Sequence, residues 1–295
     1  MRYIVFYLIL FLNIDSEIYG SRYAFTSPSG FSMGGAGFLF HSSNAQIKNP
    51  AVYNINRNFS TSVVKYPAEI NSQSIGLNLP LNNYVFSSSL KYISYGVFEG
   101  YNEYAEFTGN YKSYETWIDG YLSKKMKNFP IFIGSNLNFK SSKFNNSRIK
   151  MLSTSIGFIG YYKNINNAVG LSIHQLGIEL KNQNLFYIEP RYVLSGSKKL
   201  NYLPAIIYTD FLFENKNKTE FFMGACFSFN KSLKFITGSS TRKIDQNSSQ
   251  DLVKSILGAT GFGFIYDSDQ VVVQYGIYYY GVGVSVKGLN IGVSF

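Results

Sequence analysis

The seven residues Leu289-Asn290-Ile291-Gly292-Val293-Ser294-Phe295 alternate strictly between two kinds of position. Leu289, Ile291, Val293 and Phe295 are apolar, whereas the residues between them are polar or lack a side chain. Successive side chains of a strand point to opposite faces, so this segment has one apolar face. A soluble domain rarely places its final aromatic ring at a fraying terminus. We therefore interpret these four residues as the lipid-facing side of a last barrel strand and as a C-terminal barrel-insertion signal.

Residues 1–20 are predicted to be a secretory signal peptide. Met1 and Arg2 precede the apolar run Tyr3–Leu12, and small residues follow at Gly20 and Ser21, near the expected cleavage site. A run of about ten apolar residues suits a signal peptide, whereas a spanning helix needs about 20. An uncleaved anchor is the alternative, and export is the expectation.

The composition is compatible with a membrane barrel. Aromatic residues make up 18% of the sequence, yet the mean hydropathy is −0.04. Alternation of lipid-facing and lumen-facing residues gives this combination, although a large soluble β protein could have the same average. The single Cys226 cannot form an internal disulfide, so another constraint must stabilise an exported fold. Closing a sheet into a barrel supplies one, because it pairs every strand edge.

The net charge of +10 does not indicate nucleic-acid binding. The 27 Lys and Arg residues are scattered, many of them at turns, and form no basic stripe. Basic loop tips beside an anionic lipid surface, or a simply solvated surface, are the two interpretations left open.

From Asn58 onward, alternating segments are separated by turn residues, as in successive hairpins. The predicted strands include Ser74–Leu79, Tyr84–Tyr95, Tyr114–Met126, Phe129–Phe139, Lys150–Tyr162, Ala168–Leu180, Phe186–Lys198, Tyr202–Glu214, Glu220–Phe229, Ser232–Arg242, Val253–Tyr266, Val271–Tyr279 and Val284–Phe295. Counting Tyr101–Thr108 gives about 15; bacterial barrels have even numbers, so we predict 14, with 12 as the alternative. The predicted fold is all-β: a transmembrane antiparallel up-and-down β-barrel over residues 57–295.

The segment before the first strand carries two short motifs. Ser32-Met33-Gly34-Gly35-Ala36-Gly37-Phe38 is followed by Asn49-Pro50-Ala51. This arrangement resembles the start of the PorV/PorQ family, relatives of the FadL-type outer-membrane transporters, in which "GGAG" precedes "NPA". Glu220–Phe229, Leu233–Gly238 and Gly258–Tyr266 are similar to that family's last strands. The chain departs from the family pattern at Val52-Tyr53 and over Phe98–Lys112.

The resemblance implies a monomeric barrel of 12 to 14 strands in the bacterial outer membrane, with an N-terminal plug. It also implies one of two functions. The first is a component or shuttle of type IX protein secretion, with secretion-machinery proteins as partners that contact loops such as Phe98–Tyr111 and Lys243–Asp251. The second is a FadL-like channel for the uptake of hydrophobic small molecules, which a continuous apolar tunnel past Met33–Phe40 would support.

Residues 21–56 are expected to form the plug, and its motif residues are Gly34, Gly35, Gly37, Asn49, Pro50 and Ala51. Glycine permits positive φ and close backbone packing, while Pro50 fixes its own φ and favours an extended Asn49. A phosphate-binding loop is the alternative for the glycines, but no Lys-Ser/Thr pair follows them.

The sequence offers little for catalysis, and we predict no enzyme activity, no metal and no cofactor. His41 and His174 are the only histidines and lack a shared local spacing, and Ser172, two residues from His174, is a weak basis for a lipid-active barrel enzyme. Carboxylates on separate strands are expected to line the lumen and pair with arginines: Asp119, Glu179, Glu189 and Asp210, with Arg148, Arg191 and Arg242.

Aromatic residues near strand ends have two possible roles, an interfacial girdle or a ligand path. We favour the girdle because lipid contact requires one whatever the function. The residues are Tyr84, Tyr92, Tyr95, Tyr266, Tyr275, Tyr278, Tyr279, Tyr280 and Trp117.

Overall fold

The computed structural model describes residues 27–41, 47–144, 147–162, 164–181, 184–214, 219–241, 258–268, 270–280 and 284–295. The predicted signal peptide, residues 21–26 and 42–46 of the predicted plug, Arg242 and the Lys243–Asp251 loop lie outside the described residues.

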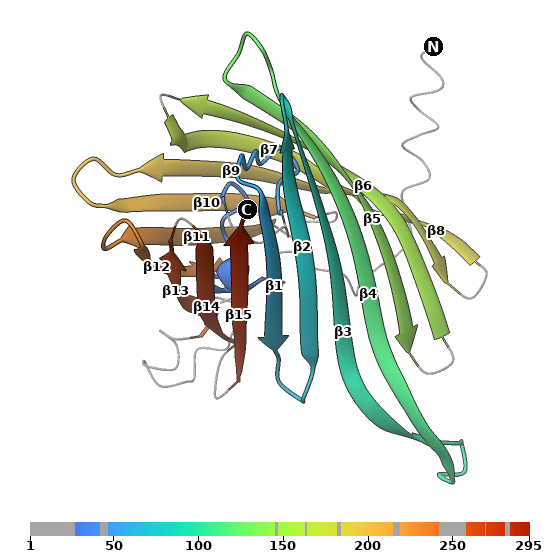
Figure 1. The fold of residues 1–295 in the computed structure, drawn as a ribbon. Helices are drawn as coiled ribbons and strands as arrows, with labels where there is room; N and C mark the ends of the chain where they lie inside the picture. Colours follow the sequence, from blue (N-terminus) through green and yellow to red (C-terminus); the bar gives the residue numbers. More distant parts are fainter. Residues whose placement is uncertain are drawn as a thin grey trace, which may run out of the picture.

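The described strands form one antiparallel sheet that closes on itself (Figure 1). Sequence neighbours pair throughout, except that β8 and β9 both pair with β7 and not with each other. Because β1 also pairs with β15, the ring is complete. The strands are β1 Asn58–Lys65, β2 Asn71–Leu81, β3 Tyr84–Tyr101, β4 Phe107–Lys125, β5 Ile131–Phe144, β6 Ser147–Tyr162, β7 Asn164–Lys181, β8 Asn184–Ile188, β9 Arg191–Lys199, β10 Ala205–Phe213, β11 Thr219–Ser228, β12 Leu233–Ser240, β13 Thr260–Asp267, β14 Val271–Tyr279 and β15 Ser285–Ser294.

Segments β8 and β9 share one position in the barrel. The first half of β7, Ala168–His174, pairs with β9, and its second half, Gly177–Lys181, pairs with β8. Glu189 and Pro190 separate the two, and proline lacks the N–H that a continuous ladder would need. The predicted strand Phe186–Lys198 is therefore interrupted, and the fifteen segments form a 14-strand barrel, which confirms the fold prediction.

The predicted separate strand Tyr101–Thr108 is wrong. Tyr101 ends β3 and Phe107 begins β4, so this stretch is the tip of a single long hairpin. The strand predicted to end at Tyr95 continues because the β3–β4 ladder runs on past two irregularities, at Ser94/Gly96 and Gly100/Tyr101. Glycine and bulges absorb the local bend without ending the pairing.

The outer surface of the barrel is apolar around its whole circumference. Large outward side chains come from successive strands, among them Phe59, Ile75, Phe86, Ile118, Leu137, Phe158, Leu171, Leu194, Phe211, Met223, Phe264, Tyr275, Leu289, Ile291 and Val293. The alternate positions carry buried polar residues that face inward, such as Ser60 and Ser62 on β1 and Asn290 on β15. This is the pattern of a barrel whose exterior contacts lipid, of the kind found in the bacterial outer membrane. Among the described residues, no helix is long and apolar enough to cross a membrane.

Two residues assigned to the aromatic girdle lie inside instead. Trp117 and Tyr278 are buried, whereas Tyr84, Tyr92, Tyr266 and Tyr275 are exposed on the outer face. The reason is register: Trp117 pairs with the inward Lys91 and Lys140. Their Nζ atoms lie 5.0 and 5.3 Å from the centroid of its ring.

The two ends of the barrel differ. β1 begins and β15 ends at one of them, which we call the terminal end. The other, the hairpin end, carries the β3–β4 hairpin, which projects well beyond the neighbouring strands (Figure 1). β12 ends and β13 begins at the hairpin end as well, because β12 begins at the terminal end.

Candidate functional site

Residues Ser27–His41 and Ile47–Asn56 lie within the barrel, and we call them the inner segment. It starts with the short helix α2, Pro28–Ser32, which packs against β12 to β15 and is seen behind β15 in Figure 1. Ser27 caps the helix: its hydroxyl accepts the N–H of Gly30 at 3.1 Å. Proline in the first turn is also favourable, because its missing N–H would have no helical partner there.

Glycines on β11 to β15 allow the backbone of the inner segment to touch the barrel wall. A Cβ on Gly261 would overlap the carbonyl of Phe31, and one on Gly238 would overlap that of Met33. These glycines are cross-strand neighbours in two adjacent rows, Gly224–Gly238–Gly261 and Gly263–Gly276–Gly288. The wall is therefore recessed where α2 and the turn after it lie.

A second group of glycines receives the Asn49-Pro50-Ala51 motif on the far side of the lumen. A Cβ on Gly134 of β5 would overlap the carbonyl of Pro50, and one on Gly157 of β6 would overlap the side chain of Asn49. Asn49 is fully buried, and its Oδ1 accepts the N–H of Ala51 at 2.9 Å. The inner segment thus crosses the lumen between two glycine-lined surfaces.

Apolar side chains fill the space between these surfaces. Phe31, Met33, Phe38 and Leu39 are each at most 4% exposed and belong to one cluster with inward residues of the wall. The wall contributes Ile159, Val193, Phe222, Ile236 and Ile265. The stretch Met33–Phe40 therefore packs directly on the barrel in this conformation.

Polar contacts fix the glycine turn of the inner segment. The three motif glycines have positive φ: 62° at Gly34, 95° at Gly35 and 90° at Gly37. The carboxylate of Asp210 on β10 accepts the N–H of Gly37 at 2.7 Å and that of Phe38 at 3.4 Å.

Lys48 bonds to the same turn from its other side. Its Nζ donates to the carbonyls of Gly35 and Ala36, each at 2.7 Å. Burial lowers the pKa of Lys48 to about 7, and the charge of Asp210 partly opposes that shift. The turn is therefore held between a buried acid on the wall and a half-buried amine of the inner segment.

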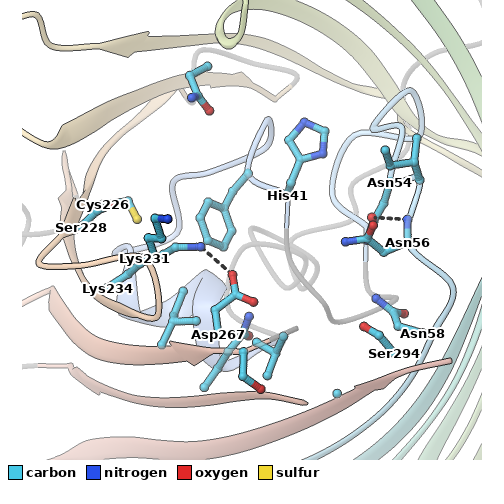
Figure 2. Close-up of a pocket in the computed structure, with 18 of the residues that line it drawn as sticks. His41, Asn54, Asn56, Asn58, Cys226, Ser228, Lys231, Lys234, Asp267 and Ser294 are labelled. Atoms are coloured by element: carbon cyan, nitrogen blue, oxygen red, sulfur yellow. Dashed lines mark hydrogen bonds and ion pairs between the residues drawn. The ribbon is translucent and has the colours of Figure 1, made fainter. Parts of the chain in front are cut away.

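A cavity of about 890 Å³ lies beside the inner segment at the terminal end (Figure 2). Phe40, Ile206 and Val272 give it apolar surface, whereas Asn54, Arg57 and Lys231 give it polar and cationic surface. At its edge Lys234 Nζ lies 2.6 Å from Asp267 Oδ2. The volume falls within the range of small-molecule sites.

His41 faces this cavity from the inner segment. Its Nε2 lies 3.2 Å from the hydroxyl of Tyr161, and burial lowers the pKa of His41 to about 4. The imidazole is therefore neutral at neutral pH. Its side chain joins the part of the inner segment nearest the cavity to β6.

Ser172 and His174 do approach one another, with Ser172 Oγ 2.8 Å from His174 Nε2. Ser172 has no exposed surface, and the ring of Phe38 packs edge-on against His174 at 5.8 Å. A substrate carbonyl has no access to this hydroxyl while the inner segment is in place. Within the described ranges, no group of three or more His, Cys, Asp or Glu residues is placed to bind a metal ion.

Two of the predicted lumen charges have partners that the sequence did not indicate. Arg191 pairs with Glu214 at 3.2 Å, a carboxylate that the prediction did not name. Asp119 accepts from Asn138 at 2.6 Å, and Arg148 is exposed. Sequence reasoning missed Lys48 and the wall glycines, although the inward phase of those glycines along each strand was a usable signal.

The predicted terminal residues also have defined positions. Leu289, Ile291 and Val293 point outward from β15, and Phe295 donates its backbone N–H to the carbonyl of Arg57 at 3.2 Å. That these four residues act as a barrel-insertion signal stays a prediction.

The fold is shared with known outer-membrane barrels. The Pseudomonas putida toluene transporter TodX is similar over 91% of this chain and 98% of its own, with a TM-score of 0.56 and 10% sequence identity. A Pseudomonas aeruginosa FadL homologue is similar over 91% of this chain and 97% of its own, with a TM-score of 0.50 and 10% identity. No protein-family model matches the chain, and no curated protein matches its sequence.

Proposed function

We propose that this protein is a monomeric, non-enzymatic channel of the FadL type, which passes hydrophobic small molecules across the bacterial outer membrane. The observation that carries the proposal is a 14-strand barrel whose lumen is crossed by a short segment packed against the wall. The similarity in fold to a toluene transporter and to a FadL homologue supports it.

The inner segment is the element that must move. Apolar side chains contact the wall from Phe31 to Leu39, so a hydrophobic solute that replaced part of these contacts would meet apolar surface from Phe222 and Ile236. The glycine turn is held to the wall by the hydrogen bonds that Asp210 accepts from Gly37 and Phe38, whereas Lys48 bonds to the turn from within the segment. Movement of the turn away from the wall therefore requires the hydrogen bonds to Asp210 to break.

The cavity at the terminal end is the proposed exit. Phe40 belongs both to the packed inner segment and to the cavity lining, so a solute leaving the packed region would enter there. The cavity then opens towards polar residues, where a solute returns to water. A binding region that becomes more polar along its length favours release.

The role in type IX protein secretion stays a prediction from the PorV/PorQ resemblance. No contact among the described residues favours it over the channel.

Uptake by cells that carry this barrel in their outer membrane tests the proposal. Labelled toluene is the hydrophobic probe, and a neutral sugar of similar size is the polar one. We expect the barrel to increase toluene uptake over cells without it and to leave sugar uptake unchanged. Equal stimulation of both solutes would indicate an ordinary aqueous pore, and stimulation of neither would contradict a transport role.

A further inference from the structure

The β3–β4 hairpin continues past the point where the barrel ends. The ladder between β2 and β3 ends at Ser94, and that between β4 and β5 begins at Tyr114. Residues 96–113 therefore form a two-stranded ribbon whose outer edges pair with no other strand in the described part of the chain.

The length of β3 places this ribbon outside the hydrocarbon. A tilted strand crosses a membrane with about 9–11 residues, and Tyr84–Tyr95 already supplies that crossing. The six residues 96–101 add roughly 20 Å along the strand, at about 3.3 Å per residue. The aromatic residues of the ribbon are thus not part of a lipid girdle.

The ribbon nevertheless exposes large apolar side chains. Val97, Tyr101, Tyr104 and Phe107 are 58%, 57%, 78% and 59% exposed. Phe98 and Tyr111 stack across the strands with centroids 5.6 Å apart, and Tyr101 meets Phe107 at 6.0 Å. Exposed apolar patches on rigid, projecting elements mark interaction surfaces.

The charge of the ribbon is opposite to that of the chain. Glu99, Glu103 and Glu106 are exposed, and Lys112 is the single basic residue among residues 96–113, so the ribbon carries −2 although the whole chain carries +10. This local negative charge favours a cationic partner and disfavours anionic lipid.

The tip is already ordered in the absence of a partner. Asn102 Oδ1 accepts the N–H groups of Tyr104 and Glu106 at 3.0 and 2.9 Å, and its Nδ2 donates to Glu106 at 2.8 Å. Tyr101 donates its hydroxyl to Glu99 at 2.6 Å. A surface ordered before binding loses less conformational entropy when it binds.

We propose that residues 96–113 are a docking surface for an extended, arginine-containing segment of another protein at the hairpin end of the barrel. Guanidinium groups stack on aromatic rings and pair with carboxylates, as the Phe98–Tyr111 pair and the three glutamates allow. The open strand edges accept an additional strand from the same partner. Longer loops of such barrels face the cell exterior, so the partner acts outside the cell.

The test uses the full-length barrel in lipid nanodiscs and a synthetic peptide of alternating Arg and Val residues, with a Glu-Val peptide for comparison. We expect saturable one-to-one binding of the Arg-Val peptide and none of the Glu-Val peptide. The triple variant Glu99→Gln, Glu103→Gln, Glu106→Gln should weaken binding at least tenfold, and Phe98→Ser with Tyr111→Ser should weaken it similarly.

Glu69→Gln is the matched control, because Glu69 is exposed on the β1–β2 turn at the same end. It should leave binding unchanged, and heat-dependent gel mobility should show that every variant retains the barrel. The proposal is overturned if the wild-type barrel does not bind the Arg-Val peptide. It is also overturned if the triple variant and Glu69→Gln change the affinity for this peptide by the same factor. Hairpin-dependent dimers in native mass spectrometry would assign the surface to a second copy and also overturn it.

Discussion

The carboxylate of Asp210, on the barrel wall, accepts the backbone N–H of Gly37, in the inner segment, at 2.7 Å. The two residues are 173 positions apart in the sequence, and both are buried. Gly37 presents its N–H from a left-handed turn with φ of 90°, which a residue with a side chain rarely adopts. A single wall residue thus fixes the conformation of the turn.

Asp210→Ala should loosen the inner segment. The substitution removes the carboxylate that accepts the N–H groups of Gly37 and Phe38 and that interacts with the charge of Lys48. We expect the free energy of unfolding to fall by about 3 kcal/mol. Limited proteolysis should then cut the inner segment faster than in the wild type. Asp267→Ala is the control, because its ion pair with Lys234 is partly exposed and contributes little. Equal protection of both variants would contradict a holding role for Asp210.

Gly261→Ala should displace α2 from the wall. The added methyl group would overlap the carbonyl of Phe31, and overpacking of this kind costs about 1–3 kcal/mol. The urea midpoint for unfolding in lipid vesicles should therefore be lower than that of the wild type. Gly160→Ala on β6 should have little effect, because a Cβ there meets nothing within 4 Å. Similar unfolding midpoints for the two variants would show that α2 does not pack as described.

Lys48 should make stability depend on pH. Burial lowers its pKa from 10.5 to about 7, so between these values the unfolded chain binds a proton that the folded barrel has released. Stability from this residue therefore rises with pH across that window and is constant below it. Lys48→Met should remove the dependence of the urea midpoint on pH over this range, whereas Lys231→Met, at the cavity edge, should not. If the urea midpoint of Lys48→Met changed with pH as steeply as that of the wild type, the assignment of this pH dependence to Lys48 would be refuted.

The Ser172–His174 contact should be structural. Because Ser172 is fully buried beneath the inner segment, the wild type, Ser172→Ala and His174→Ala should hydrolyse a p-nitrophenyl ester at the same background rate. Removing the buried hydrogen bond should instead cost about 1 kcal/mol in urea unfolding. Wild-type esterase activity that disappears in both variants would reverse this conclusion.

The barrel could be predicted from sequence because lipid imposes a strict period of two on the strands. That period identified β15 and its outward Leu289, Ile291 and Val293 without any knowledge of their partners. It could not assign Tyr101–Thr108, because a ribbon outside the membrane carries no such constraint. Pro190 is tolerated at a strand end, so the interruption between β8 and β9 also gave no clear signal.

The candidate site was less predictable, because its contacts join distant parts of the chain. The motif glycines Gly34, Gly35 and Gly37 could be identified locally, since positive φ is a property of one residue. The partnership of Lys48 and Asp210 with the turn depends on barrel register, which a single sequence does not specify. The same is true of the wall glycines, whose roles depend on what lies opposite.

Movement of the inner segment is the central claim, and a reversible cross-link tests it most directly. A Cβ built on Gly224 would lie 3.1 Å from the Cβ of Ala36, within about half an ångström of disulfide geometry. We would introduce Ala36→Cys and Gly224→Cys in a Cys226→Ser background and measure uptake of labelled toluene. The account predicts background uptake in the oxidised barrel and restored uptake after reduction. Equal uptake in both states would contradict it.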